Sequence, residues 1–212
     1  MSINASILVV DDHQIVFNGI KLIVQNSREQ YHLEHCYNGD EAYDLIKHAN
    51  YDLVILDVNL PDTDTLQLVQ LLLVLKPKLK ILIFSMSPLE MYAKRFLKLG
   101  TFGYLSKQSS SEEFLRAVKQ VLNGEKYISK EVAAILSEDL IYGREENVFA
   151  KLTDREIEIM GYLLKGLGGT AISKITNLHT STIGTHKNHI YEKLGVNNII
   201  ELKELAQLHK YK

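Results

Sequence analysis

The sequence has few of the features that mark secreted or membrane-spanning chains. Its single cysteine, Cys36, cannot form a disulfide within the chain, which fits a reducing setting. No apolar run approaches the roughly 18 residues of a transmembrane helix, and even Leu71 to Leu75 is short. The first residues, Met1 to Ser6, lack the basic and long apolar segments of a signal peptide. We therefore expect a cytoplasmic protein with no membrane segment.

The composition indicates a folded chain of one large or two small domains. Of its 212 residues, 46% are hydrophobic and 24% charged, which is ordinary for a globular protein and unlike disordered or collagen-like chains. The net charge of -2 hides an asymmetry, because residues 1–150 carry 15 basic against 20 acidic side chains and residues 151–212 carry 9 against 6. The basic C-terminal part suggests an anionic partner, although two domains of different composition explain the asymmetry equally well.

Strand-like and helix-like segments alternate over the first 125 residues. Short apolar runs predict strands at 7–10, 53–56, 81–84 and 102–105. Helical periodicity predicts helices near 14–26, 39–49, 63–75, 89–99 and 111–123, the last capped by a serine among residues 109–111. This alternation predicts a doubly wound α/β fold, in which helices cover both faces of a parallel sheet.

The remainder of the chain has the pattern of a small all-α domain. A short helix is expected near 130–140, within a segment at 126–148 that we assign as the linker between domains at 1–125 and 149–212. Thr153 and Glu156 form the sequence of a capping box, which predicts the start of a helix. Further helices are expected near 170–176, 180–194 and 198–209.

Three carboxylates stand where predicted strands end. Asp11 and Asp12 follow the first strand and Asp57 follows the strand at 53–56, so all three are expected at the sheet edge where doubly wound folds bind ligands. Close carboxylates repel one another unless a cation lies among them, and oxygen ligands suit Mg²⁺. Ser85 and Lys107 lie at later strand ends on the same edge. The five residues predict a site where Asp57 is a nucleophile for a phosphoryl group, with the metal and Lys107 offsetting its charge.

These stretches resemble the receiver domain of two-component response regulators over about residues 4–125. The matching segments are Val9-Val-Asp-Asp12, Leu56-Asp-Val-Asn-Leu-Pro61, Phe84-Ser85 and Gly103-Tyr-Leu-Ser-Lys107. The resemblance implies a five-stranded, flavodoxin-like sheet and a sensor histidine kinase that donates a phosphoryl group to Asp57. It implies Mg²⁺ binding by Asp11, Asp12, Asp57 and the Asn59 backbone carbonyl, with Ser85 and Lys107 contacting the phosphoryl oxygens. It also implies that Tyr104 is the switch residue, whose aromatic ring rotates as the serine moves. The alternative is that Tyr104 is an ordinary half-buried tyrosine of a strand.

One position departs from the receiver pattern. The family usually has glycine eight residues after the phosphorylated aspartate, and this chain has Thr65 there. A glycine-only backbone conformation would be strained for a β-branched residue. We therefore expect a loop of different shape after Asp57, with an effect on the rate of phosphorylation.

The helices near 170–176 and 180–194 form a candidate helix-turn-helix. Ile183, Ile190 and Leu194 are expected to form the buried stripe of the second helix. Small and polar residues on its other face suit contacts with bases and phosphates, and two lysines suit phosphates. The candidate DNA contacts are Ser181, Thr182, Gly184, Thr185, Lys187, Asn188 and Lys174. A helical protein-binding domain would show the same pattern equally well.

Residues 148–212 also resemble the LuxR-type DNA-binding domain. The matching segments are Leu152-Thr-Asp-Arg-Glu156, Leu163-Leu-Lys-Gly-Leu167 and the stretch from Ser181 to Val196. With the receiver domain in front, the chain resembles the NarL/FixJ class of response regulators. The resemblance implies that the helix at 181–194 enters the major groove of double-stranded DNA. It also implies that the last helix, around Ile199 to Leu208, forms a homodimer upon phosphorylation.

Gly184 stands where this family usually has a basic residue. Glycine removes a phosphate or base contact and costs about 1 kcal/mol of helix stability relative to alanine. Gly168 and Gly169 also loosen the preceding turn. We therefore expect weaker DNA binding than is usual for the class. Of His186 and His189, which could also donate to phosphates, one is expected to be buried or to cap a helix.

Three kinds of function fit these observations to different degrees. The leading hypothesis is a transcription regulator that phosphorylation switches, and not an enzyme. A second is a signalling protein whose altered helix-turn-helix binds a protein in place of DNA, which Gly184 and the low basic charge favour. A third is a phosphatase that uses the carboxylate pocket, but no second general acid lies close to Asp57 in the sequence.

Overall fold

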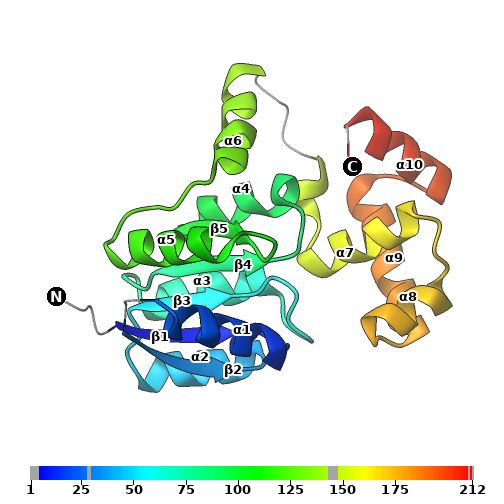
Figure 1. The fold of residues 1–212 in the computed structure, drawn as a ribbon. Helices are drawn as coiled ribbons and strands as arrows, with labels where there is room; N and C mark the ends of the chain where they lie inside the picture. The colour runs from blue at the N-terminus through cyan, green and yellow to red at the C-terminus, as the bar shows by residue number, and fades with distance from the viewer. Residues whose placement is uncertain (1–4, 28–29, 143–147, 210, 212) are drawn as a thin grey trace. The chain divides into compact units, whose positions relative to one another are not determined.

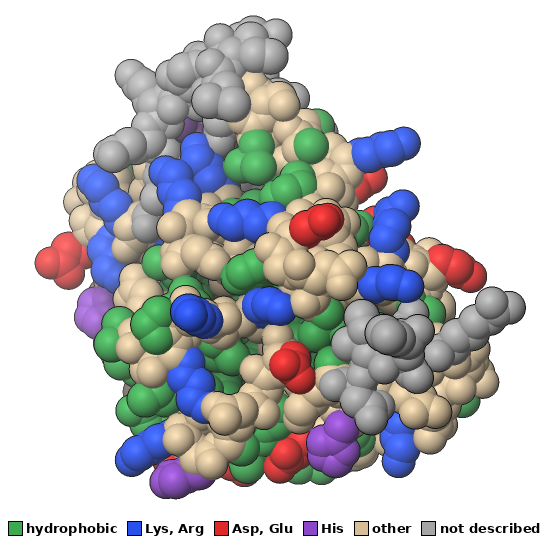
Figure 2. Space-filling model, turned by 90° about the vertical axis from the view of Figure 1, so that its left-hand side faces the viewer, with side chains coloured by type: hydrophobic (Ala, Val, Ile, Leu, Met, Phe, Trp, Pro, Cys, Tyr) green, Lys and Arg blue, Asp and Glu red, His purple; other side chains and the backbone are tan. Residues whose placement is uncertain are grey.

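The computed structural model describes residues 5–27, 30–142, 148–209 and 211 (Figure 1). The chain divides into two compact units, Met1–Gly143 and Arg144–Lys212. Each unit has its own buried apolar core. Charged side chains of both signs are interspersed over the face drawn in Figure 2. Among the described residues, no helix combines the length and apolar content needed to cross a membrane.

The first unit is a five-stranded, all-parallel sheet between two layers of helices, as predicted. The strands are β1 (Ala5–Val10), β2 (Tyr31–Cys36), β3 (Leu53–Leu56), β4 (Ile81–Ser85) and β5 (Gly103–Ser106), in the order β2-β1-β3-β4-β5. The helices are α1 (Gln14–Gln25), α2 (Gly39–His48), α3 (Thr65–Leu75), α4 (Leu89–Leu99) and α5 (Ser111–Leu122). Helices α1 and α5 pack together on one face, and α2, α3 and α4 lie on the other (Figure 1).

The strands form because short apolar runs are buried on both faces of the sheet. Every residue of β3 and β4 is buried, and α1 and α5 contribute Ile20, Phe114 and Val118 to the core against β1, β3, β4 and β5. Strand β2 was not located from the sequence pattern. It lies at the sheet edge, and five of its six residues are exposed or only half-buried, so it lacks the continuous apolar run that marks the other strands.

Helix boundaries follow local capping. Ser110 caps α5 by accepting a hydrogen bond from the Glu113 N–H, as the serine cluster predicted. Helix α3 begins at Thr65 and not near residue 63, because Asp64 is the cap and its carboxylate accepts from the Gln67 N–H.

The segment after α5 packs on the first unit. Tyr127 is buried and donates its N–H to the Phe102 carbonyl, which extends the sheet edge beside β5. Helix α6 (Lys130–Tyr142) follows and contacts α4. Much of the segment assigned as a linker therefore contacts the sheet domain, while residues 143–147 lie outside the described residues. The functional domain boundaries at 125 and 148 stay a prediction.

The second unit is all-helical. It contains a short 3-10 helix, η1 (Val148–Lys151), followed by α7 (Asp154–Leu164), α8 (Gly169–Thr176), α9 (Thr180–Leu194) and α10 (Ile199–Leu208). The capping box of α7 is present, since Thr153 and Glu156 each accept from the other's backbone N–H. Gly169, expected in the turn, is the first residue of α8. Helix α9 ends at Leu194 and is followed by Gly195, which has the left-handed conformation.

Candidate functional site

Two buried carboxylates and one ammonium meet at the C-terminal edge of the sheet. Asp11 follows β1 and is 2% exposed, and Asp57 follows β3 and is 4% exposed. The Nζ atom of Lys107, after β5, lies 2.7 Å from an oxygen of each. The structure therefore brings together residues that are 46 and 50 positions apart, as expected from their places at the ends of parallel strands.

Backbone hydrogen bonds that continue the strand ladders hold these residues in place. The Asp11 N–H donates to the Cys36 carbonyl, and the Asp57 N–H donates to the Val10 carbonyl. The Lys107 N–H donates to the carbonyl of Ser85. Each functional residue is thus fixed one step beyond a strand, where its side chain faces the open edge.

The charges of this pocket are coupled. Burial opposes the ammonium form of Lys107, but the Asp57 carboxylate and the hydrogen bonds from Lys107 to Asp11 and Asp57 outweigh it, so the pKa of Lys107 is raised. Lys107 is therefore a fixed positive charge against two buried carboxylates. Removing it would leave those carboxylates without compensation.

The pocket also contains the atoms that a hard divalent cation binds. Asp11, Asp12, His13 and Asp57 each offer a ligand atom, and these atoms all lie within 4.8 Å of one another. The Oδ1 atom of Asp57 is buried and accepts no hydrogen bond in the described part of the chain. The three carboxylates of this pocket, Asp57 among them, fit Mg²⁺. His13 was missed from the sequence, although its place directly after Asp12 could have indicated it.

Ser85, Tyr104 and Asn59 are linked through one further serine, Ser87. The Ser85 hydroxyl accepts from the Ser87 N–H at 3.2 Å, and the Tyr104 hydroxyl donates to the Ser87 carbonyl at 2.9 Å. Asn59 donates its amide to the Ser87 hydroxyl at 3.0 Å. Tyr104 is fully buried beside Phe96. Ser87 was not predicted, and it connects the loops after β3 and β4 with Tyr104 of β5.

The loop after Asp57 accommodates Thr65 without strain. Among the described residues other than glycine, only Asp62 and Asn177 have positive φ, so the left-handed position of this loop falls on Asp62. Thr65 is helical and fully buried, and its hydroxyl donates to the Val58 carbonyl at 2.7 Å. The backbone strain expected for a β-branched residue at position 65 is therefore absent. Thr65 instead ties the start of α3 to the segment that follows Asp57.

The second candidate surface is the outer face of α9. Ile183 and Ile190 are buried against α7 and α8, while Leu194, expected in the same stripe, is only half-buried. Thr182 is also half-buried. The Thr185 hydroxyl donates a hydrogen bond to the Ser181 carbonyl at 3.2 Å. The remaining predicted DNA contacts are all exposed, namely Ser181, Gly184, Thr185, Lys187, Asn188 and Lys174.

A charged network lies under α9. Glu156 is 2% exposed and accepts from the Lys193 ammonium at 2.7 Å. His189 is exposed, 3.9 Å from the same carboxylate, whereas His186 is half-buried. Burial lowers the pKa of His186, although the Glu156 carboxylate raises it in part. Of the two histidines, His186 is the less exposed, although it is half-buried and not fully buried as one of them was expected to be.

Comparisons with protein families find a match for each of the two units. Residues 7–119 match the family described as response regulator receiver domain, and residues 150–206 match the family described as bacterial regulatory proteins, luxR family. The fold and the acidic pocket thus define a two-component response regulator with a LuxR-type DNA-binding domain. More particularly, the chain belongs to the NarL/FixJ class of response regulators.

Relatives cover almost the whole chain. The Fimbriae Z protein of Salmonella typhimurium is 30% identical over 208 residues, which is 97% of this chain and 98% of that protein. The response regulator GacA of Pseudomonas aeruginosa is 28% identical, with 96% of this chain and 95% of that protein covered. A solved complex of the response regulator RcsB with DNA is 23% identical with a TM-score of 0.57, covering 97% of this chain and 98% of that one, and shows the shared fold.

Proposed function

We propose that Asp57 accepts a phosphoryl group from a sensor histidine kinase, with Mg²⁺ held by Asp11, Asp12, Asp57 and the Asn59 backbone carbonyl. One observation carries this proposal. Lys107 holds one oxygen of Asp57 at 2.7 Å, while the other oxygen is buried and accepts no hydrogen bond in the described residues. One oxygen is thus oriented and the other is available for attack.

The residues divide the chemistry between them. The Oδ1 atom of Asp57 forms the new bond to phosphorus, and the bond between phosphorus and the donor histidine nitrogen breaks, leaving its electron pair on that nitrogen. Lys107 and Ser85 lie at the same edge and would contact the phosphoryl oxygens. When bound, Mg²⁺ supplies positive charge that offsets the charge of the carboxylates and phosphoryl oxygens. The Tyr104 hydroxyl donates a hydrogen bond to the Ser87 carbonyl, and the Tyr104 ring would change its orientation as Ser85 turns toward the phosphoryl group.

Asp57→Asn tests the acceptor. We expect no phosphoryl uptake from acetyl phosphate with Mg²⁺ by the variant, measured by the mass of the intact protein. Asp62→Asn is the matched control, because Asp62 is exposed in the same loop and asparagine tolerates its positive φ. Uptake by Asp57→Asn equal to that of the control would place the acceptor at another residue.

We further propose that α9 reads promoter DNA in the major groove, and that phosphorylation favours a homodimer through α10. A solved structure contains two RcsB dimers bound to DNA, and this chain shares that fold at 22% identity with a TM-score of 0.60. The exposed face of α9 offers small side chains that allow close approach, and Lys174 and Lys187 offer two exposed ammonium groups. Such a regulator acts in the cytoplasm, where the chromosome lies.

Selection from fragmented genomic DNA tests this readout. The purified protein is incubated with the fragments, with and without acetyl phosphate and Mg²⁺. A palindromic site enriched after phosphorylation is the expected result. If neither state enriches any DNA while Asp57 is phosphorylated normally, the helix-turn-helix domain has a protein partner in place of DNA.

A further inference from the structure

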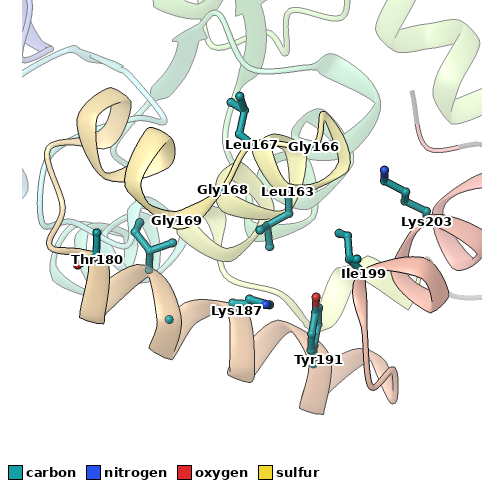
Figure 3. A pocket seen from close by; sticks show the side chains of 12 residues that line it. Leu163, Gly166, Leu167, Gly168, Gly169, Thr180, Lys187, Tyr191, Ile199 and Lys203 are labelled. Carbon is teal, nitrogen blue, oxygen red and sulfur yellow. The ribbon is translucent and has the colours of Figure 1, made fainter.

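A cavity of about 500 Å³ opens in the second unit between the α7–α8 turn, α9 and the start of α10 (Figure 3). Leu163 of α7, Ile183 of α9 and Ile199 of α10 line it with apolar side chains. Figure 3 shows Leu163 and Tyr191 pointing into this space from α7 and α9. Its volume lies within the range of about 300–1,000 Å³ that is usual for small-molecule sites.

The cavity exists because glycine replaces side chains along its walls. Four of its lining positions are Gly166, Gly168, Gly169 and Gly184. A Cβ atom added at Gly166, Gly168 or Gly184 would meet no other group within 4 Å. The two departures noted in the sequence, the glycine pair before α8 and Gly184 in α9, therefore open the same space.

Three side chains of the cavity, Tyr191, Lys187 and Lys203, can donate a hydrogen bond to a ligand, and Thr180 adds a hydroxyl that can donate or accept. The Tyr191 hydroxyl oxygen is buried and has no hydrogen-bond partner among the described residues. Burial raises the pKa of Tyr191, so the hydroxyl keeps its proton at neutral pH. Lys187 lies with its Nζ atom 5.4 Å from the centre of the Tyr191 ring, and Lys203 reaches the same cavity from α10.

The charge of the lining is of one sign. Lys187 and Lys203 are exposed ammonium groups without a carboxylate partner in the described part of the chain, and no acidic residue lines the cavity. A buried hydroxyl without a partner carries a desolvation cost that a ligand acceptor would remove. Apolar walls, two ammonium groups and one unpaired donor are together complementary to an anion with an apolar body.

We propose that this cavity binds a small aromatic or branched monocarboxylate. The carboxylate faces Lys187 and Lys203 and accepts a hydrogen bond from the Tyr191 hydroxyl, while the apolar body packs on Leu163, Ile183 and Ile199. No DNA contact and no phosphorylation is needed for this binding, so its test is independent of the function proposed above.

Benzoate is the probe, added to the full-length ¹⁵N-labelled protein and followed by NMR. We expect saturable shifts of the amide signals of Gly166, Gly168, Gly169 and Gly184, and none at Gly19 or Gly124 of the first unit. Acetate lacks the apolar body and benzamide lacks the charge, so each is expected to bind more weakly than benzoate.

Tyr191→Phe is the decisive variant, because it removes only the hydroxyl. It is expected to bind benzoate about 10- to 100-fold more weakly, the usual value of one hydrogen bond to a charged acceptor. Lys203→Gln should weaken benzoate binding and leave benzamide binding unchanged. Tyr162→Phe is the matched control, since Tyr162 is also half-buried near a lysine ammonium but does not line the cavity.

Four results would overturn the proposal. Benzoate shifts that do not saturate, or that Tyr191→Phe leaves at wild-type affinity, would show that the cavity is not a ligand site of this kind. Equal binding of acetate or benzamide would remove the requirement for an apolar anion. Shifts of the cavity glycines that depend on protein concentration alone would show that a second copy of the chain covers the cavity.

Discussion

The two functional regions of this chain place their polar groups in opposite ways. In the receiver pocket, Asp11 and Asp57 are almost completely buried, and the side chain of Lys107 is 10% exposed. On the outer face of α9 the predicted contacts other than Thr182 are exposed and mostly uncharged, and Gly184 has no side chain at all. A buried charge must have partners in the protein itself, whereas an exposed recognition face is completed only by its partner.

The largest expected effect is a loss of stability when the buried charges of the receiver pocket lose their partner. Lys107→Met keeps most of the side-chain length but removes the charge between two buried carboxylates. We expect the free energy of unfolding of the receiver unit to fall by about 3–5 kcal/mol at neutral pH, because the carboxylates lose their compensation. Urea unfolding followed by the NMR signals of the sheet measures this change.

A surface lysine provides the control for that experiment. Lys98→Met, exposed near the end of α4, should change the same free energy by less than about 0.5 kcal/mol. Mg²⁺ should stabilise Lys107→Met more than the wild type, since a cation then replaces the missing ammonium. A variant as stable as the wild type would mean that the two carboxylates do not depend on Lys107.

The second unit also contains a buried charged residue, Glu156, whose role is to stabilise the fold. Burial opposes the charged form of Glu156, but hydrogen bonds from Lys193 and the Thr153 N–H outweigh burial, so the pKa of Glu156 is lowered from 4.5. A carboxylate with a lowered folded-state pKa stabilises the fold above its unfolded pKa. That stability is lost as the pH falls through the folded-state pKa.

Glu156→Gln tests this assignment. It should cost about 1–2 kcal/mol of unfolding free energy at pH 7, because a charged acceptor is replaced by a neutral one that still caps α7. The difference from wild type should shrink as the pH falls below 4.5, which urea titrations at several pH values would measure. Glu204→Gln, exposed on α10, is the control and should change the unfolding free energy at pH 7 by less than about 0.5 kcal/mol. A difference that is constant with pH would assign the effect to packing.

Gly184→Lys tests the exposed face of α9 by adding a positive charge to it. The position has open space around an added Cβ, so lysine fits without displacing a neighbour. We expect tighter DNA binding and a salt dependence steeper by about one unit of slope, from one added phosphate contact. The helix should also gain about 0.7–1 kcal/mol from the loss of glycine.

Gly184→Ala separates those two effects. It should reproduce the gain in helix stability without the change in salt dependence, which DNA titrations at several salt concentrations would detect. An unchanged salt slope for Gly184→Lys would show that α9 does not approach phosphates at this position.

The same contrast explains how much could be predicted from the sequence. The strand pattern made it possible to predict Asp11, Asp12, Asp57 and Lys107. Parallel strands bring their C-terminal ends to one edge of the sheet, so side chains that are far apart in the sequence were expected to lie close together. Strand β2 was missed because an edge strand that is half-exposed has no apolar run. Ser87 was missed because its role depends on hydrogen bonds that join two loops and strand β5, which no local pattern encodes.

Glycines were the least predictable residues in functional terms. At Thr65 the expected need for glycine disappears because Asp62 takes the left-handed conformation three residues earlier. At Gly168, Gly169 and Gly184 the sequence shows only missing side chains. Their joint consequence, a cavity, depends on how α7, α8, α9 and α10 pack, which is a tertiary property.

The smallest expected effect compares a capped helix of the receiver with an uncapped helix of the second unit. Ser110 caps α5 through its hydroxyl, whereas α8 begins after Gly168, which has no side chain to accept from the Thr170 or Ala171 N–H. Gly168→Ser should therefore stabilise α8 by about 0.3 kcal/mol, and Ser110→Gly should weaken α5 by a similar amount. Amide hydrogen exchange in the first turn of each helix measures both changes. Opposite signs in the two helices would show that capping alone distinguishes them. Equal signs would mean that the glycine before α8 is retained for the space it leaves in the cavity and not for the conformation of the turn.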